Sequence, residues 1–228
     1  MIAEMNGSVS QTGPADDPVG YMRTPTPQIR AFMEQQRASM PITDFLEMSA
    51  EIRSIYMKYK ESLEATPRGA GRAQALHRMM EGAMATASDV VVSCKVGCCG
   101  CCHGEVEVTR DEAEILRNRV VGGVAVDLDR LKAQASRERR SPEWAKFWSV
   151  ENRCVFLGEG GACRIYEDRP AACRRLLVTT PPEACTTLGA AIAPVRIVLA
   201  EILLSAAVAV DDTGLASLSK RLAPLLAP

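Results

Sequence analysis

Nine cysteines place the strongest constraint on this chain, because five of them fall within nine consecutive residues. The stretch 94–102 reads Cys-Lys-Val-Gly-Cys-Cys-Gly-Cys-Cys and is followed at once by His103. The other four are Cys154, Cys163, Cys173 and Cys185, so no cysteine lies before residue 94 or after residue 185. The thiols therefore form one constellation, and we expect the helices on either side to be its scaffold.

Such a cluster has three interpretations. Cysteine can be a small buried hydrophobic residue, but five in nine residues is not a core-packing pattern. Disulfides need an oxidising compartment, and the polar N-terminus lacks the basic start and apolar stretch of a signal peptide, so we expect a cytoplasmic protein with reduced thiols. Thiolates brought together need a cation to neutralise them, and metal ligation is therefore the favoured interpretation.

The composition limits the partners. The chain has 228 residues, with 27 basic and 28 acidic side chains, so its charge gives no reason to expect nucleic acid or an anionic membrane. The apolar run 188–210 is interrupted by Pro194, Arg196 and Glu201, and charges are costly in lipid. We expect a buried core helix there rather than a membrane span.

The predicted fold is mainly α: an irregular helical bundle with a small β-hairpin and cysteine-rich metal-binding loops. Residues 1–25 are expected to be a flexible tail, and 26–228 a single helical domain that contains the cysteine region 90–186. Apolar spacing and capping residues predict helices over 27–39, 43–64, 72–87, 111–117, 127–137, 188–210 and 213–226. The segment Thr109–Glu112 has the pattern of a capping box. A short helix after Pro142 is expected to carry Trp144, Phe147 and Trp148 on one side.

Around the distal cysteines, two short apolar runs at 154–157 and 162–166 flank a glycine-rich stretch and predict a β-hairpin. Asp168 and Pro170 then predict a helix start, which would favour the thiolate of Cys173. Gly97 and Gly100 allow the first cluster to fold tightly. The following arginines could offset thiolate charge, or form surface ion pairs: Arg164, Arg169, Arg174 and Arg175.

These motifs resemble the YkgJ-type cysteine-cluster family, whose domain is described as zinc- or iron-chelating. The first half shares Cys94-x2-Gly97-Cys98-x2-Cys101-Cys102-His103, followed by Val106-Glu107-Val108-Thr109 and Glu112-Ala113. The second half shares Cys154-x-Phe156-Leu157, the run Gly161-x-Cys163-x-Ile165-Tyr166-Glu167-x-Arg169-Pro170-x2-Cys173-Arg174 and a closing Cys185. By position the resemblance implies eight metal ligands: Cys94, Cys98, Cys101, Cys102, Cys154, Cys163, Cys173 and Cys185. Cys99 is outside this pattern.

Eight thiolates could hold two tetrahedral zinc ions or an iron–sulfur centre with spare ligands, and nine could hold three bridged zinc ions. His103 is a candidate accessory ligand, whereas His77 is expected to be a packing or surface residue. The leading hypothesis is a metal-binding protein that holds zinc or an iron–sulfur or iron centre. The alternative is an iron- or iron–sulfur-dependent enzyme in redox chemistry or peptide modification, which needs an open position beside the metal. No other catalytic signature is present.

Overall fold

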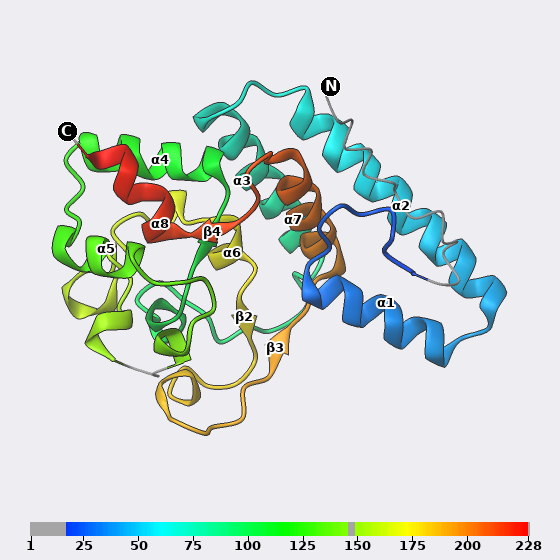
Figure 1. Ribbon diagram of the computed structural model, residues 1–228. Helices are drawn as coiled ribbons and strands as arrows, with labels where there is room; N and C mark the ends of the chain where they lie inside the picture. The colour runs from blue at the N-terminus through cyan, green and yellow to red at the C-terminus, as the bar shows by residue number, and fades with distance from the viewer. Residues whose placement is uncertain (1–16, 146–148, 228) are drawn as a thin grey trace.

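The computed structural model describes residues 17–145 and 149–227. One half of the molecule is built from long helices and the other from short ones (Figure 1). The first half contains α1 (Pro27–Ser39), α2 (Ile42–Glu64), α3 (Ala70–Ala85) and α7 (Val198–Val210). The second contains α4 (Arg110–Val121), α5 (Leu128–Ala135), α6 (Ala171–Arg174) and α8 (Leu218–Leu222). The mainly α fold that the sequence predicts is therefore confirmed.

Side-chain caps mark the starts of α1, α4 and α5. The Thr26 hydroxyl accepts the amide of Ile29 at 3.2 Å at the start of α1, which confirms the expected helix 27–39. Thr109 and Glu112 form the predicted capping box of α4. Asp127 accepts the amide of Arg130 at 2.9 Å and begins α5. These caps satisfy amide groups that a helix start leaves free, so local sequence is enough to fix the boundaries.

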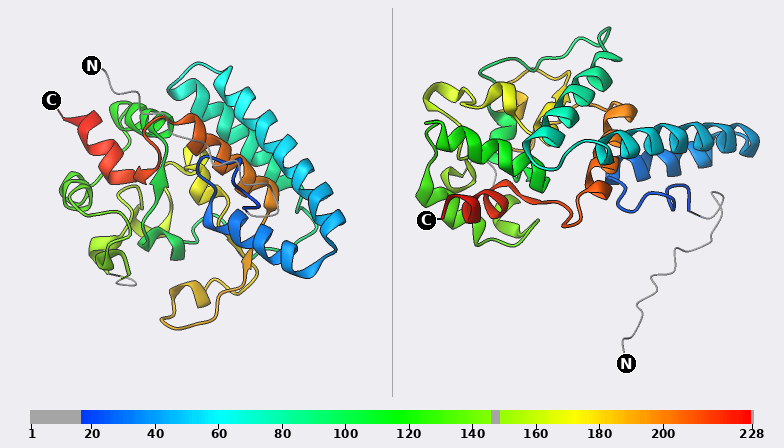
Figure 2. Two further views of the ribbon diagram at one scale, coloured as in Figure 1. Left: turned by 45° about the vertical axis from the view of Figure 1, so that its right-hand side comes forward. Right: turned by 90° about the horizontal axis from the view of Figure 1, so that it is seen from above.

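The core of the first half forms around α7, which packs against α2 and α3 and receives α1 on the same side. All views agree that α1 and α2 extend away from the second half (Figure 2). Val19 and Met22, within the segment expected to be a flexible tail, are buried in this core. Residues 1–16, the larger part of that segment, lie outside the described residues.

A separate apolar cluster holds the second half together around α4, α5 and α8. Its buried members include Leu116, Leu131, Phe156 and Leu222. Cys154 and Cys163 are half-buried at its edge. The second half of the cysteine motif is thus attached directly to this smaller core.

The strands are short and pair antiparallel in two separate sheets. β1 (Glu107–Val108) pairs with β4 (Ala216–Ser217), and β2 (Leu177–Val178) pairs with β3 (Pro194–Val195). The hairpin expected over 154–166 is reduced to a single bridge between Leu157 and Cys163, because tight turns occupy most of both runs. Short 3-10 helices complete the chain: η1 (Gly100–His103), η2 (Pro142–Ala145), η3 (Val150–Asn152), η4 (Glu159–Gly161), η5 (Tyr166–Asp168), η6 (Ala184–Thr186) and η7 (Ala223–Leu226).

Two predicted helices near the C-terminus are too long. The run 188–210 becomes helical only at Val198, because the segment before it forms a loop and β3. The helix predicted over 213–226 divides into β4, α8 and η7. None of the helices in the described part of the chain combines the length and apolarity needed to span a bilayer. The expected helix after Pro142 is η2, which carries Trp144, whereas Phe147 and Trp148 lie outside the described residues.

Candidate metal centre

The first cysteine motif folds into a tight turn that ends in η1. The amide of Cys98 donates to the carbonyl of Lys95 at 3.0 Å, and the amide of Cys102 donates to the carbonyl of Cys99 at 3.0 Å. Gly97 has a φ of 87°, in the left-handed region that glycine adopts without strain. A β-carbon at Gly100 would lie 2.5 Å from the β-carbon of Cys185, so glycine is what allows the last cysteine to approach the first motif.

The second motif is joined to the first by the backbone. The amide of Cys154 donates to the carbonyl of Cys102 at 2.7 Å. The Cys154 sulfur accepts hydrogen bonds from the backbone amides that follow it, at Phe156 and Leu157. The Cys163 sulfur accepts one from Ile165 in the same way. Such N–H···S contacts hold sulfur atoms in fixed directions and favour their charged form.

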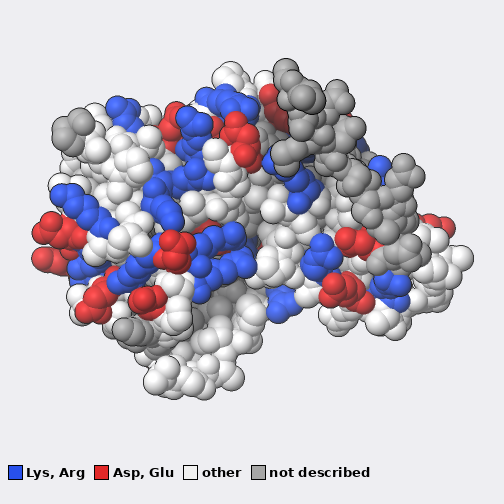
Figure 3. Space-filling view, in the orientation of Figure 1, with Lys and Arg blue, Asp and Glu red and all other residues white. Residues whose placement is uncertain are grey.

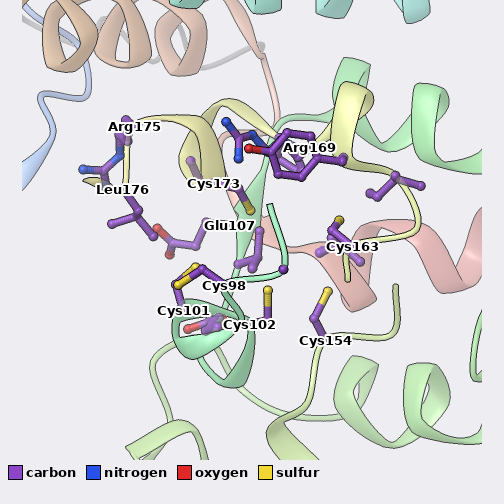
Figure 4. Close-up of a pocket in the computed structure, with 18 of the residues that line it drawn as sticks. Cys98, Cys101, Cys102, Glu107, Cys154, Cys163, Arg169, Cys173, Arg175 and Leu176 are labelled. Carbon is purple, nitrogen blue, oxygen red and sulfur yellow. The ribbon is translucent and has the colours of Figure 1, made fainter. Parts of the chain in front are cut away.

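Cysteines from both motifs surround one cavity of about 330 Å³. Six of them line it: Cys98, Cys101, Cys102, Cys154, Cys163 and Cys173. In Figure 4 the sulfurs of Cys102, Cys154 and Cys173 point into the space between them, with Cys163 beside them. Two segments that are more than fifty residues apart in the sequence thus contribute to one site, as the sequence predicts.

The other three cysteines lie outside this lining. Cys94 accepts a hydrogen bond from the amide of Val178 at 3.4 Å, and its thiol is an electrostatic neighbour of Cys98 and Cys101. Cys185 has the same two neighbours in addition to Cys94. Cys99 instead lies against the glycine-rich turn, where a β-carbon at Gly161 would be 3.3 Å from its sulfur.

All nine thiols are free, but they do not yet form a coordination sphere. Across residues 17–145 and 149–227, no three His, Cys, Asp or Glu side chains are arranged so that they could hold a metal ion as they stand. The donor chemistry fits zinc or iron, since both bind thiolates. Ligation requires the sulfurs around the cavity to move toward one another.

The protonation of the thiols follows their burial and mutual contacts. Burial raises the pKa of Cys154 to about 11 and also raises the pKa of Cys173. The hydrogen bond between the adjacent thiols of Cys101 and Cys102 lowers the pKa of Cys101 to about 7 and raises that of Cys102. Without a cation most of these sulfurs therefore favour the neutral thiol, and Cys101 is the first to lose its proton.

Two of the four arginines expected near the distal cysteines line the cavity. The guanidinium of Arg169 lies 4.2 Å from the ring centroid of Tyr166, and its charge partly opposes the rise that burial causes in the pKa of Cys163. Arg175 forms an ion pair with Glu201 at 2.6 Å. The guanidinium groups of Arg164 and Arg174 bond to partners elsewhere.

Glu112 joins three helices behind the cavity. Its carboxylate accepts the amide of Ala171 at 2.7 Å and the amide of Thr109 at 3.0 Å, and lies 3.3 Å from Nε2 of His77. Burial alone would favour the neutral acid, but these contacts outweigh it and hold the pKa of Glu112 below its usual value. His77 is buried and is thus a packing residue.

Nδ1 of His103 lies 3.2 Å from the carbonyl of Cys99, and His103 does not line the cavity.

Three further charged residues line the cavity: Glu105, Glu107 and Arg140. The sequence places the two glutamates near the cluster and assigns them no role. The basic run 137–140 is typical of a solvated helix end, and nothing in the sequence indicates that Arg140 reaches this cavity. The place of Arg140 depends on tertiary structure, because its backbone amide donates a hydrogen bond to the carboxylate of Glu105, 35 residues earlier in the chain.

Comparison with known proteins gives a match over the cysteine region. Residues 93–186 match the family model CxxCxxCC, described as "Putative zinc- or iron-chelating domain". Searches of curated proteins and of solved structures found no match. The matched segment begins one residue before Cys94 and ends one residue after Cys185, so it contains all nine cysteines.

Proposed function

Because residues 93–186 match a family model described as zinc- or iron-chelating, we propose that this protein holds zinc or iron through thiolates supplied by both cysteine motifs. The observation that carries the proposal is the single cavity lined by six cysteines of both motifs. The proposed ligands are Cys94, Cys98, Cys101, Cys102, Cys154, Cys163, Cys173 and Cys185. The cytoplasmic location expected from the sequence belongs to this proposal, because reducing conditions keep thiols available for a metal.

The eight ligands divide into two sets of four. Cys101 and Cys102 are consecutive residues whose thiols affect each other's pKa, and we assign one of them to each set. The outer set is Cys94, Cys98, Cys101 and Cys185, whose thiols are electrostatic neighbours. The inner set is Cys102, Cys154, Cys163 and Cys173, which face one another across the cavity (Figure 4). Four sulfurs are the complement of a tetrahedral zinc ion or of one iron–sulfur cluster.

The surrounding chain orients the sulfurs and compensates their charge. Backbone amides at Val178, Phe156 and Ile165 donate to ligand sulfurs, which favours thiolates in the directions that the fold fixes. Arg169 offers a cation beside the inner set. A bound metal would add the positive charge that these buried thiols need in order to ionise together.

A second function, that of an enzyme, is favoured by the space beside the thiolates. A structural zinc site is closed by its four ligands, whereas this cavity has a volume of about 330 Å³ and is also lined by Tyr166, Arg140 and Glu105. A metal in such a site could meet a substrate, in redox chemistry or in peptide modification.

Anaerobic purification followed by metal and acid-labile sulfide analysis tests the proposal. Two four-thiolate sites predict about two zinc ions per chain and a colourless protein, or labile sulfide and a brown colour if iron–sulfur clusters occupy them. A protein that retains neither zinc nor iron, and takes up neither on reconstitution, would contradict the proposal. Visible colour and labile sulfide also distinguish a colourless structural zinc protein from one that holds an iron–sulfur centre for redox chemistry.

A further inference from the structure

A second cavity adjoins the cysteine cavity. Its volume is about 450 Å³, and it shares Glu107, Arg140 and Arg175 with the first. Its remaining walls come from residues 24–28, from α7 and from Leu215 and Arg139. No cysteine lines it. We call the two cavities together the groove.

The groove is richer in positive charge than the rest of the chain. Four guanidinium groups line it, those of Arg139, Arg140, Arg169 and Arg175, against two carboxylates, those of Glu105 and Glu107. The whole chain has a formal net charge of −1. In Figure 3 basic side chains border a hollow near the middle of this face. The groove therefore favours a negatively charged ligand.

Arg140 is held in a strained conformation at the junction of the two cavities. Its φ of 58° is the one positive value among the described residues other than glycine. The amide of Arg140 donates to the Glu105 carboxylate at 2.8 Å, which helps to fix this backbone. Its side chain is 60% exposed and makes only a loose ion pair with Glu107 at 3.6 Å. Strain of this kind persists mainly where a residue is fixed for binding, and here it presents an available guanidinium.

Arg175, which also lines both cavities, is fixed by an ion pair with the buried Glu201. Its Nη1 bonds to Glu201, and the other oxygen of that carboxylate accepts the hydroxyl of Thr26 at 2.8 Å. The Nε of Arg175 has no hydrogen-bond partner among the described residues. A buried donor of this kind usually has a partner in the functional state.

The second cavity also has apolar walls. Leu204 and Val208 of α7, with Leu215, line it together with the arginines. A ligand that fills it therefore needs both an anionic group and an apolar part. A bare inorganic ion would leave this apolar surface unused.

We propose that the groove binds an organic anion, with its carboxylate or phosphate between Arg140 and Arg175 and its apolar part against Leu204 and Val208. The ligand then lies with its charged end next to the cysteine cavity. Neutralising the thiolates does not explain Arg139, which pairs with Glu107 and lines only the cavity without cysteines, whereas Arg140 lines both cavities.

The test is an NMR titration of the metal-loaded protein with phenyl phosphate, phenylacetate and neutral phenylacetamide, in which Arg Nε–Hε and amide signals are followed. Both anions are expected to perturb Arg140 and Arg175 and to bind more tightly than the amide. Arg140→Gln should weaken anion binding by roughly tenfold, the effect of losing a charge-assisted hydrogen bond. Arg117→Gln is the matched control, because Arg117 is exposed on α4 and lines neither cavity.

Arg140→Gly separates binding from folding. Glycine adopts a φ of 58° without strain, so this variant should keep its thermal stability and metal content yet lose the preference for anions. The proposal is wrong if the amide binds as well as the anions, if no probe binds at all, or if both Arg140 variants bind like the native chain. A loss of metal in the Arg140 variants would instead assign the arginine to the metal centre. Failure of the metal-binding proposal appears separately, as absence of metal in the native chain.

Discussion

Cys99 and Cys173 differ in what surrounds their sulfurs. Cys173 lines the cysteine cavity, whereas Cys99 lies against Gly161 and outside the lining. We therefore predict that Cys173→Ser loses metal and that Cys99→Ser keeps nearly all of it. Loss of one ligand weakens a site sharply, because structural zinc contributes about 10–16 kcal/mol in finger peptides.

Metal content per chain and far-ultraviolet circular dichroism of both variants check this prediction. The helical signal should survive in both, since the core around α7 contains no cysteine. Equal loss of metal from the two variants would make all nine cysteines ligands and favour three bridged zinc ions. If neither variant loses metal, the hypothesis of a thiolate metal centre is wrong.

Gly100 offers a test of how the last cysteine is positioned. A β-carbon there would lie 2.5 Å from the β-carbon of Cys185 and 3.0 Å from its carbonyl oxygen, so the two segments must separate. We predict that Gly100→Ala weakens metal retention against a chelator by displacing Cys185. Gly104→Ala is the control, because its nearest contact would be 3.9 Å and its φ of −118° suits any residue. If the two variants release metal at the same rate, Cys185 is not held by this contact or is not a ligand.

Of the eight cysteines that the sequence predicts as ligands, six line the cavity, but the other residues around it are harder to predict. Cysteine spacing and the glycines at 97 and 100 indicate a tight thiolate turn, and the cavity brings the two motifs together. Arg140 could not be found in this way, because its place depends on a backbone contact with Glu105 across 35 residues. A basic run carries no information about which of its members faces inward.

At the scale of elements, Glu112 connects the start of α4 to α3 and α6. Its contacts hold the pKa of its carboxyl below the usual value, so the charged form stabilises the fold at neutral pH. That contribution is complete above the unfolded-state pKa of about 4.3 and is lost as the pH falls through the lower folded-state pKa. We predict that Glu112→Gln lowers the free energy of unfolding at pH 7 by about 1.5–3 kcal/mol and reduces its dependence on pH below about pH 5.

Urea unfolding of both proteins from about pH 7 to about pH 3, in the same metal state, measures this difference. Glu51→Gln, at an exposed position of α2, should stay within about 0.5 kcal/mol of the native chain. Parallel pH curves for the native chain and Glu112→Gln would show that the carboxylate charge does not stabilise the fold.

Elements were predictable where caps and periodic apolar residues coincide. α1 and α4 carry both signals, and their starts are confirmed. The start of α7 was not predictable, since the run 188–210 is apolar both before and within the helix. Pairing of β3 with β2 decides the boundary, and such pairing depends on residues distant in sequence. The predicted hairpin over 154–166 is wrong for a local reason, because turns around Cys154 and Cys163 replace the strands.

At the scale of the whole molecule, the helical half and the cysteine region depend on metal to different degrees. The two apolar clusters around α2, α3 and α7 contain no cysteine, whereas Cys154 and Cys163 belong to the third. We predict that chelation of the metal leaves amide exchange in α2 and α7 slow and speeds it in 93–104 and 150–187. The reason is that local opening depends on local contacts, and the cysteines lie on turns and short helices rather than on the long helices.

Hydrogen-exchange mass spectrometry before and after chelation makes the comparison within one chain, so the helical half is its own control. Rebinding of zinc or iron should restore protection in both loops together, because Cys102 and Cys154 are linked by a backbone hydrogen bond and their sulfurs face one cavity. Recovery of one loop without the other would mean that the two motifs hold separate metals without shared contacts. Loss of protection throughout α2 and α7 would mean that the metal stabilises the whole fold, as in a zinc finger, despite a helical core large enough to form without it.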